Sequence, residues 1–211
     1  MAEAQIKRRL AAVFAADVVS YSRMIEADEA GTRARLVALQ NEQIGPRIAS
    51  AGGRVVKTTG DGLLGEFPSA VDAVSTALQI QAAVKRYNVD LPEACRIVLR
   101  IGINVGDVII ENDDIHGDGV NVAARLEGIC GPGEVFVSGT VYDQAAGKLA
   151  AAFENLGEQR LKNLARPIRV YRASIEANAE AKPTAHKAGA ALPPPLPEKP
   201  SIAVLPFANL S

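Results

Sequence analysis

Asn121 and Arg125 are the first residues of this sequence whose types and spacing suggest chemistry. They fall near the start of a segment predicted as a helix, residues 119–128, and positions i and i+4 share one helical face. Both side chains should therefore point at the same target. The guanidinium of Arg125 suits phosphate, and the amide of Asn121 can hydrogen-bond a sugar or an oxyanion. The plainer alternative is an exposed polar stripe on an amphipathic helix.

Two carboxylates at predicted strand ends suggest a site for divalent cations. Asp17 ends the first apolar run, and Asp61 lies in the turn 59–62 (TGDG). Each has a plainer explanation, since aspartate often forms turns and Asp-Gly favours a hairpin. Together they can share Mg²⁺, which prefers a few carboxylates plus phosphate oxygens. Two such ions can hold the attacking and leaving oxygens of a displacement at phosphorus.

The residues after Asp17 could bind phosphate through the backbone. Ser20, Tyr21 and Ser22 lie where a strand is expected to turn into a helix, a geometry that points N–H groups at an anion. The sequence has no glycine-rich loop followed by Lys-Ser or Lys-Thr, which excludes a P-loop enzyme.

Strands and helices alternate through residues 10–174, and they must position these side chains. Apolar runs predict strands at 10–19, 54–57, 63–67, 96–110, 134–138, 152–156 and 168–173. Helical spacing predicts helices at 26–49, disturbed near Gly45-Pro46, after the N-cap Ser69, and at 119–128. The order βαββαβ, with hairpins where crossovers would be too short, predicts a ferredoxin-like α/β sandwich with additional strands.

Composition divides the 211 residues into four parts. Residues 1–9 are a charged lead-in, and residues 10–174 are expected to form the folded domain. Residues 175–200 are rich in alanine and proline and predict a linker without a packed core. Residues 201–211 begin another strand, which we interpret as the start of a truncated C-terminal domain.

Charge and cysteine content exclude several classes of protein. A net charge of −1 provides no electrostatic footprint for nucleic acid. Cys95 and Cys130 have no metal-type spacing, so reduced thiols in a cytoplasmic protein are expected. The N-terminal apolar run is too short for a signal peptide or a membrane span, which predicts no membrane contact from this segment.

Four motifs in order carry a resemblance to a known family. They are the segments 14–22 (FAADVVSYS), 57–62 (KTTGDG), 100–106 (RIGINVG) and 114–125 (DIHGDGVNVAAR). With them the chain resembles the catalytic domain of bacterial class III nucleotidyl cyclases from about Arg9 to Arg172. Two residues depart from the family pattern. Ser20 stands where the family often has glycine. His116 replaces a more usual aromatic or apolar residue, and we expect it to lie on the surface or to face a dimer partner. Asp118 is expected to cap the helix.

The resemblance implies a metal site and a dimer. Asp17 and Asp61 match the two metal-binding aspartates, and the backbone carbonyl of Val18 would complete a metal shell around Mg²⁺ or Mn²⁺. In this family the metal residues of a site come from one catalytic domain, and the purine and transition-state residues come from the other. This chain carries both sets, so a homodimer would have two equivalent sites and a monomer should be inert.

The resemblance also implies how the nucleotide is held. Asn121 would position the ribose, and Arg125 would stabilise charge in the transition state. Arg100 and Lys162 would contact the triphosphate. The implied reaction is attack of the ribose 3′-hydroxyl on the α-phosphate, which releases pyrophosphate.

Lys57 and Asp114 match the pair that reads the purine edge in the family. An ionised Asp114 only accepts and matches the N6 amine of adenine, whereas Lys57 only donates and matches N1. Guanylyl relatives usually carry glutamate and a small polar or cysteine side chain there. The pair therefore favours ATP, and the chain is predicted to be an adenylate cyclase.

Several alternatives stay open. A guanylate cyclase is the nearest one, and the Lys57/Asp114 pair disfavours it. A catalytically silent nucleotide-binding or dimerisation module would have lost a metal or transition-state residue, whereas every such position is filled. A diguanylate cyclase would carry a Gly-Gly-Asp/Glu-Glu-Phe signature, which is missing. Lys57 and Asp114 could also form an ion pair without function.

Overall fold

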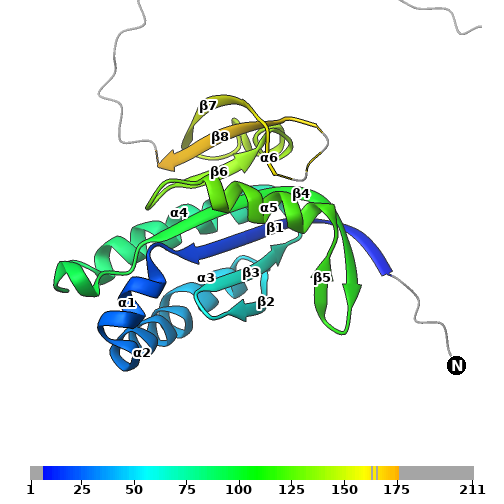
Figure 1. Ribbon diagram of the computed structural model, residues 1–211. Helices are drawn as coiled ribbons and strands as arrows, with labels where there is room; N and C mark the ends of the chain where they lie inside the picture. Colours follow the sequence, from blue (N-terminus) through cyan, green and yellow to red (C-terminus); the bar gives the residue numbers. More distant parts are fainter. Residues whose placement is uncertain (1–6, 163, 165, 176–211) are drawn as a thin grey trace, which may run out of the picture. The chain divides into compact units, whose positions relative to one another are not determined.

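The structure, a computed structural model, describes residues 7–162, 164 and 166–175. Its eight-stranded sheet has the order β2-β3-β1-β4-β6-β8-β7, with β5 paired to β4 (Figure 1). The strands are β1 (Lys7–Val18), β2 (Arg54–Thr59), β3 (Gly62–Phe67), β4 (Leu99–Glu111), β5 (Asp114–His116), β6 (Val135–Ser138), β7 (Ala151–Gln159) and β8 (Ile168–Ile175). The helices are α1 (Tyr21–Ala27), α2 (Glu29–Leu39), a π-helix (Gln40–Ile44), α3 (Gly45–Ser50), α4 (Ala70–Tyr87), a 3₁₀-helix (Glu93–Cys95), α5 (Asp118–Ile129) and α6 (Gly139–Ala145).

The first four strands confirm the predicted ferredoxin-like arrangement. β2, β3, β1 and β4 lie side by side, and each neighbouring pair is antiparallel. Along the chain they follow the order strand, helices, hairpin, helix and strand, which is the βαββαβ order. β6 extends the sheet parallel to β4, and the antiparallel strands β8 and β7 complete it.

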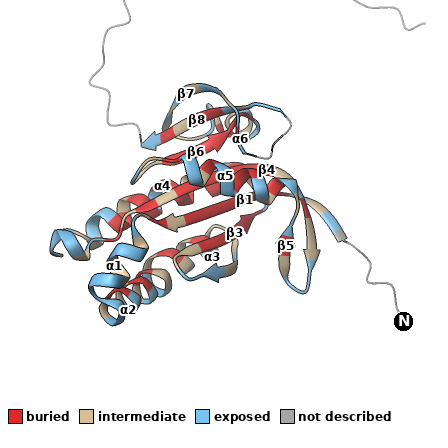
Figure 2. Cartoon of the chain, in the orientation of Figure 1, coloured by how far each residue is buried: buried red, intermediate tan, exposed pale blue. Residues whose placement is uncertain are grey.

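Residues 11–16 of strand β1 are buried and separate two hydrophobic clusters, one on each face of the sheet (Figure 2). Because side chains alternate across a strand, Phe14 and Val13 point to opposite sides of the sheet. Phe14 belongs to the same cluster as Leu39 of α2 and Val74 of α4. Val13 belongs to a second cluster with Ala123 of α5. Helices α2–α4 thus cover one face of the sheet, and α5 covers the other.

The helical region after β1 differs from the single helix expected at residues 26–49. It begins at Tyr21 and is interrupted at Asp28, whose backbone is not helical. The carboxylate of Asp28 accepts a 2.9 Å hydrogen bond from the N–H of Gly31. This cap starts α2. The disturbance expected near Gly45-Pro46 is the π-helical turn at residues 40–44, because Pro46 has no N–H to donate to the preceding turn.

Several smaller boundaries also differ from expectation. β1 begins at Lys7, so part of the predicted lead-in is paired strand. The segment expected at 96–110 is the single strand β4, which forms a hairpin with the unexpected strand β5. Helix α6 was not expected either. Among the described helices, none is both long and apolar enough to cross a membrane. The predicted linker and C-terminal domain, beyond Ile175, lie outside the described residues.

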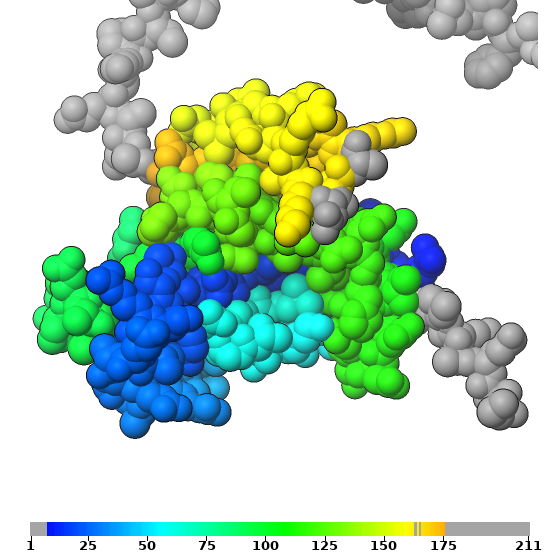
Figure 3. All heavy atoms as spheres, viewed as in Figure 1, coloured from blue at the N-terminus to red at the C-terminus, as the bar shows by residue number. Residues whose placement is uncertain are grey.

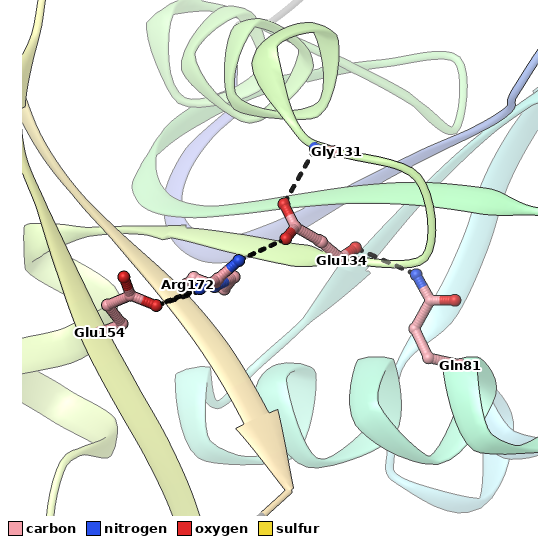
Figure 4. A network of polar contacts seen from close by, with 5 residues as sticks. All are labelled: Gln81, Gly131, Glu134, Glu154 and Arg172. Atoms are coloured by element: carbon pink, nitrogen blue, oxygen red, sulfur yellow. Dashed lines mark hydrogen bonds and ion pairs between the residues drawn. The ribbon is translucent and has the colours of Figure 1, made fainter.

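A polar network joins α4 to the segment between α5 and β6 (Figure 4). The buried side chain of Gln81 donates two 3.0 Å hydrogen bonds, to the carbonyl oxygens of Leu99 and Glu134. Arg172 of β8 binds the carboxylates of Glu134 and Glu154. The network therefore fixes the chain that leaves α5 against the sheet.

Replacing Gln81 by alanine is expected to lower the free energy of unfolding by about 1–3 kcal/mol, because two buried hydrogen bonds are lost. Gln79→Ala is the matched control, since Gln79 is an exposed residue of the same helix. Urea unfolding followed by circular dichroism measures both variants. Equal destabilisation by the two substitutions would contradict this role of the network.

The two cysteines lie in different environments. Cys130 is buried, and burial raises the pKa of its thiol to about 12, whereas Cys95 is partly exposed. Since the thiolate is the reactive form, we expect Cys95 to react rapidly with Ellman's reagent and Cys130 only after unfolding. Cys95→Ser should remove the rapid phase of the absorbance change. A rapid phase that survives this substitution would show that Cys130 is accessible.

Candidate active site

Asp17 and Asp61 come together because β1 and β3 are neighbours. Asp17 lies near the end of β1, and Asp61 lies in the β2–β3 turn, where Gly60 has a φ of +62°. β1 pairs with β3 through Ala16 and Leu63, which places the turn beside Asp17. The two carboxylates line a pocket of about 270 Å³. Burial is the main cause that raises the pKa of Asp61, and the charge of the neighbouring Asp17 also raises it.

A third carboxylate, Glu127 of α5, lines the same pocket, which we call the acidic pocket. Its side chain is 16% exposed, and burial, followed by the charge of Asp17, raises its pKa to about 7. Glu127 is not among the site residues predicted from the sequence. Helical periodicity could have placed it there, since it follows Val120 by seven positions and Ala124 by three, and both residues line this pocket.

Arg100 of β4 lies among these carboxylates. It stands opposite Asp17 in the β1–β4 pairing, and its guanidinium binds the Asp17 carboxylate. Its Nε atom lies 3.2 Å from Oε1 of Glu127, but the two atoms are not aligned as a hydrogen bond. Both atoms are buried without a hydrogen-bond partner in the described part of the chain. The predicted contact of Arg100 with the triphosphate stays a prediction.

The donors of the acidic pocket fit divalent cations such as Mg²⁺ and Mn²⁺. Carboxylate oxygens are the hard ligands that these ions prefer, and the unpartnered oxygen of Glu127 indicates that Arg100 alone does not satisfy the cluster. Within residues 7–162, 164 and 166–175, no three acidic, histidine or cysteine side chains converge to hold a metal ion. A cation here would therefore need water and phosphate oxygens as well, as nucleotide-bound Mg²⁺ does.

The predicted phosphate loop follows Val18, the last residue of β1. Ser20 has a φ of 58° and a ψ of 30°, in the left-handed region that glycine adopts at least cost. The loop thus keeps this conformation although the resembled family often has glycine there. Tyr21 and Ser22 are the first two residues of α1, and N–H groups of a first helical turn have no partner within the helix.

Lys57 of β2 and Asp114 of β5 form an ion pair. Lys57 Nζ lies 2.7 Å from Asp114 Oδ2, and the N–H of Ile115 donates to Oδ1 at 2.7 Å. The hydrogen bond from Lys57 is the main cause that lowers the pKa of Asp114, so this carboxylate only accepts. The exposed His116 also approaches Asp114, with its Nε2 atom 3.4 Å from Oδ2.

Asn121 and Arg125 lie four positions apart on α5, and both are exposed. Arg125, Arg160 and Lys162 line a pocket of about 220 Å³, which we call the cationic pocket. Lys162 was predicted from the sequence, but Arg160 was not, because its position directly after β7 carries no distinctive motif. Neither Asn121 nor Arg125 lines the acidic pocket.

The start of α5 differs from expectation. Asp118 is the first helical residue rather than the cap. The N-cap is Gly117, whose φ of +114° favours glycine. The carboxylate of Asp118 still lies in the first turn, where negative charge complements the helix dipole.

Comparisons of sequence show the family of this chain. A sequence model of the family described as "Adenylate and Guanylate cyclase catalytic domain" matches residues 3–173. The protein named "Putative adenylate cyclase 3" from Rhizobium meliloti (strain 1021) is 47% identical over 212 residues, which cover 100% of this chain and 35% of that protein. An "Adenylate cyclase" from Streptomyces coelicolor is 33% identical over 135 residues, or 64% of this chain and 34% of its own length. The chain thus spans about a third of these two relatives.

A solved structure shows the same architecture. The crystal structure of an adenylate/guanylate cyclase/hydrolase from Silicibacter pomeroyi superimposes with a TM-score of 0.73 at 46% identity. The match covers 81% of this chain and 99% of that one.

Proposed function

Because this chain belongs to the adenylate and guanylate cyclase catalytic domain family, we propose that it is a class III adenylate cyclase. It converts ATP to 3′,5′-cyclic AMP and pyrophosphate. ATP binds at two equivalent sites across a homodimer, each with two Mg²⁺ or Mn²⁺ ions. The names of the Rhizobium meliloti and Streptomyces coelicolor relatives support adenylate over guanylate cyclase.

The different directions of Glu127 and Arg125 on α5 are the observation that carries the shared site. Glu127 faces the acidic pocket, whereas Arg125, two residues earlier on α5, lines the cationic pocket. At about 100° per residue, these two side chains leave the helix about 200° apart. A two-fold dimer would bring the acidic pocket of one chain against Asn121 and Arg125 of its partner, and would do so twice.

The choice of ATP rests on Lys57 and Asp114. An ionised carboxylate and an ammonium group 2.7 Å apart offer one acceptor and one donor side by side. Adenine presents the complementary N6 amine and N1 acceptor. Guanine presents O6 and N1–H, which would leave both side chains mismatched, and mismatched buried polar groups discriminate by about 10⁴-fold in favourable cases.

The reaction divides among the remaining side chains. Asn121 holds the ribose so that the 3′-oxygen, the phosphorus and the leaving oxygen align. Arg125 stabilises the charge on the phosphoryl oxygens in the transition state. Arg100 and Lys162 bind the triphosphate and hold the pyrophosphate leaving group in place.

Asp17, Asp61 and the carbonyl oxygen of Val18 would hold the cations. When bound, the cations supply electrostatic stabilisation of the attacking and leaving oxygens. The N–H groups of the loop with Ser20 and of Tyr21 and Ser22 would bind the phosphates, since they carry no structural partner within α1.

Product formation by the purified chain tests this function. ATP and GTP are offered separately with Mg²⁺ or Mn²⁺ over a range of protein concentrations. We expect cyclic AMP, with a rate per chain that rises with protein concentration as dimers form. Cyclisation of GTP instead would contradict the argument from Lys57 and Asp114. No product from either nucleotide in a dimeric sample would favour a silent regulatory module.

A further inference from the structure

Glu66 is a charged residue inside the sheet. It lies on β3, between β1 and β2, and only 3% of its side chain is exposed. Arg9 of β1 and Arg54 of β2 both bind one carboxylate oxygen, Oε1. The other oxygen, Oε2, is buried and has no hydrogen-bond partner among the described residues. Burying a charge with incomplete pairing is costly, so a contribution to stability does not account for this residue.

Arg54 extends this network to the β4–β5 hairpin. Its Nε atom binds Glu66, and its Nη1 atom donates a 3.0 Å hydrogen bond to the carbonyl oxygen of Asp113. Asn112 and Asp113 have φ values of 47° and 66°, as in the type I′ turn of a two-residue hairpin. Arg54 therefore binds the turn at the residue directly before Asp114.

Strand β2 thus holds the hairpin at two points. Lys57 binds the carboxylate of Asp114 at 2.7 Å, three positions along β2 from Arg54. In Figure 3 the hairpin (green) adjoins β2 and β3 (cyan), and β2 and β5 are in contact. When Lys57 and Asp114 bind a purine, the bond between these two side chains is replaced by bonds to the base. The hydrogen bond from Arg54 to the backbone carbonyl of Asp113 involves neither Lys57 nor the side chain of Asp114, so it persists when a purine is bound.

We propose that Arg54, oriented by Glu66, is a positioning residue for base recognition. It holds the turn at residues 112–113, and with it Asp114, at the separation from Lys57 that lets both read one adenine. The planar fork of arginine suits this role, since one nitrogen binds the carboxylate while another reaches the turn. The proposal rests on the proposed function and extends it to residues outside the four motifs of the family.

Arg54→Gln and Arg9→Gln form a matched pair that tests the proposal. Each variant removes one bond to Glu66, but only Arg54→Gln removes the bond to the turn. Calorimetry with the full chain and Mg²⁺ measures the affinities for 3′-deoxy-ATP and 3′-deoxy-GTP, which cannot be cyclised. We expect Arg54→Gln to bind 3′-deoxy-ATP about tenfold more weakly and to lose preference for adenine. Arg9→Gln should keep both values although its melting temperature falls.

The proposal would be overturned if Arg54→Gln and Arg9→Gln had the same affinities for the two analogues. Arg54 would then have a structural role only. Arg54→Lys keeps the charge without the fork, and it should show most of the loss. It also serves as the test if Arg54→Gln does not fold. Wild-type protein that binds 3′-deoxy-ATP but does not cyclise ATP would contradict the proposed function alone. Wild-type protein that binds neither analogue would overturn both.

Discussion

Two inactive variants of this chain, Asp61→Asn and Arg125→Ala, are expected to recover activity when they are mixed. Asp61→Asn removes a carboxylate from the acidic pocket, and Arg125→Ala removes the cation that we propose stabilises the transition state. Each variant alone should lose at least about 10²-fold in turnover. In a mixed dimer, one of the two sites takes Asp61 from one chain and Arg125 from the other, so it is intact. Since half of randomly formed dimers are mixed, about a quarter of wild-type activity should return.

Both variants should fold, which makes the mixture interpretable. Burial and the charge of Asp17 already disfavour the ionised form of Asp61, so its replacement by asparagine removes an unfavourable charge. Arg125 is exposed on α5. The rate of cyclic AMP formation is measured after the separately purified variants are mixed at a concentration that supports dimers.

A control mixture separates shared sites from other effects of mixing. Asp17→Asn and Asp61→Asn both alter the acidic pocket, so their mixture should stay inactive. Native mass spectrometry establishes that mixed dimers are present. Mixed dimers of Asp61→Asn and Arg125→Ala without recovered activity would rule out a site that takes these two residues from different chains.

The core of the fold was predictable because it follows from local patterns. The apolar run 11–16 is a strand buried on both faces, and Ser69 caps α4 by accepting a hydrogen bond from the N–H of Asp72. β5 was not predictable, since its three residues (DIH) carry no apolar pattern and form a strand only by pairing with β4. Helix α6 is likewise too short, at seven residues, for periodicity to identify.

Some residues of the candidate site could likewise be predicted from local sequence patterns, and others could not. Asn121 and Arg125 could be predicted to share a face because four positions along a helix fix their relation. Glu66 could not be identified, because its partner Arg9 is 57 positions away in the sequence. A glutamate in a strand has the same local signature whether it is buried or exposed. Only the packing of β1, β2 and β3 around it makes Glu66 a buried charge.

Exchange of Lys57 and Asp114, the proposed base-reading pair, is expected to reverse the proposed preference for ATP. Lys57→Glu with Asp114→Cys replaces the donor by an acceptor and the acceptor by a small weak donor. Guanine N1–H can then donate to the new carboxylate, while adenine N1 faces it as a second acceptor. We expect kcat/KM for ATP to fall by about 10³-fold or more and GTP to become the better substrate. Separate assays of cyclic AMP and cyclic GTP measure the change.

This change should act on recognition rather than on folding. The side chains of Lys57 and Asp114 are 39% and 31% exposed, and such partly exposed pairs contribute about 1 kcal/mol or less to stability. Lys57→Met is the matched control, since it breaks the same ion pair without reversing its polarity. It should lose activity with ATP without gaining activity with GTP. If the double variant instead keeps its kcat/KM for ATP, Lys57 and Asp114 are an ion pair that does not read the base, and the choice of ATP must lie elsewhere in the site.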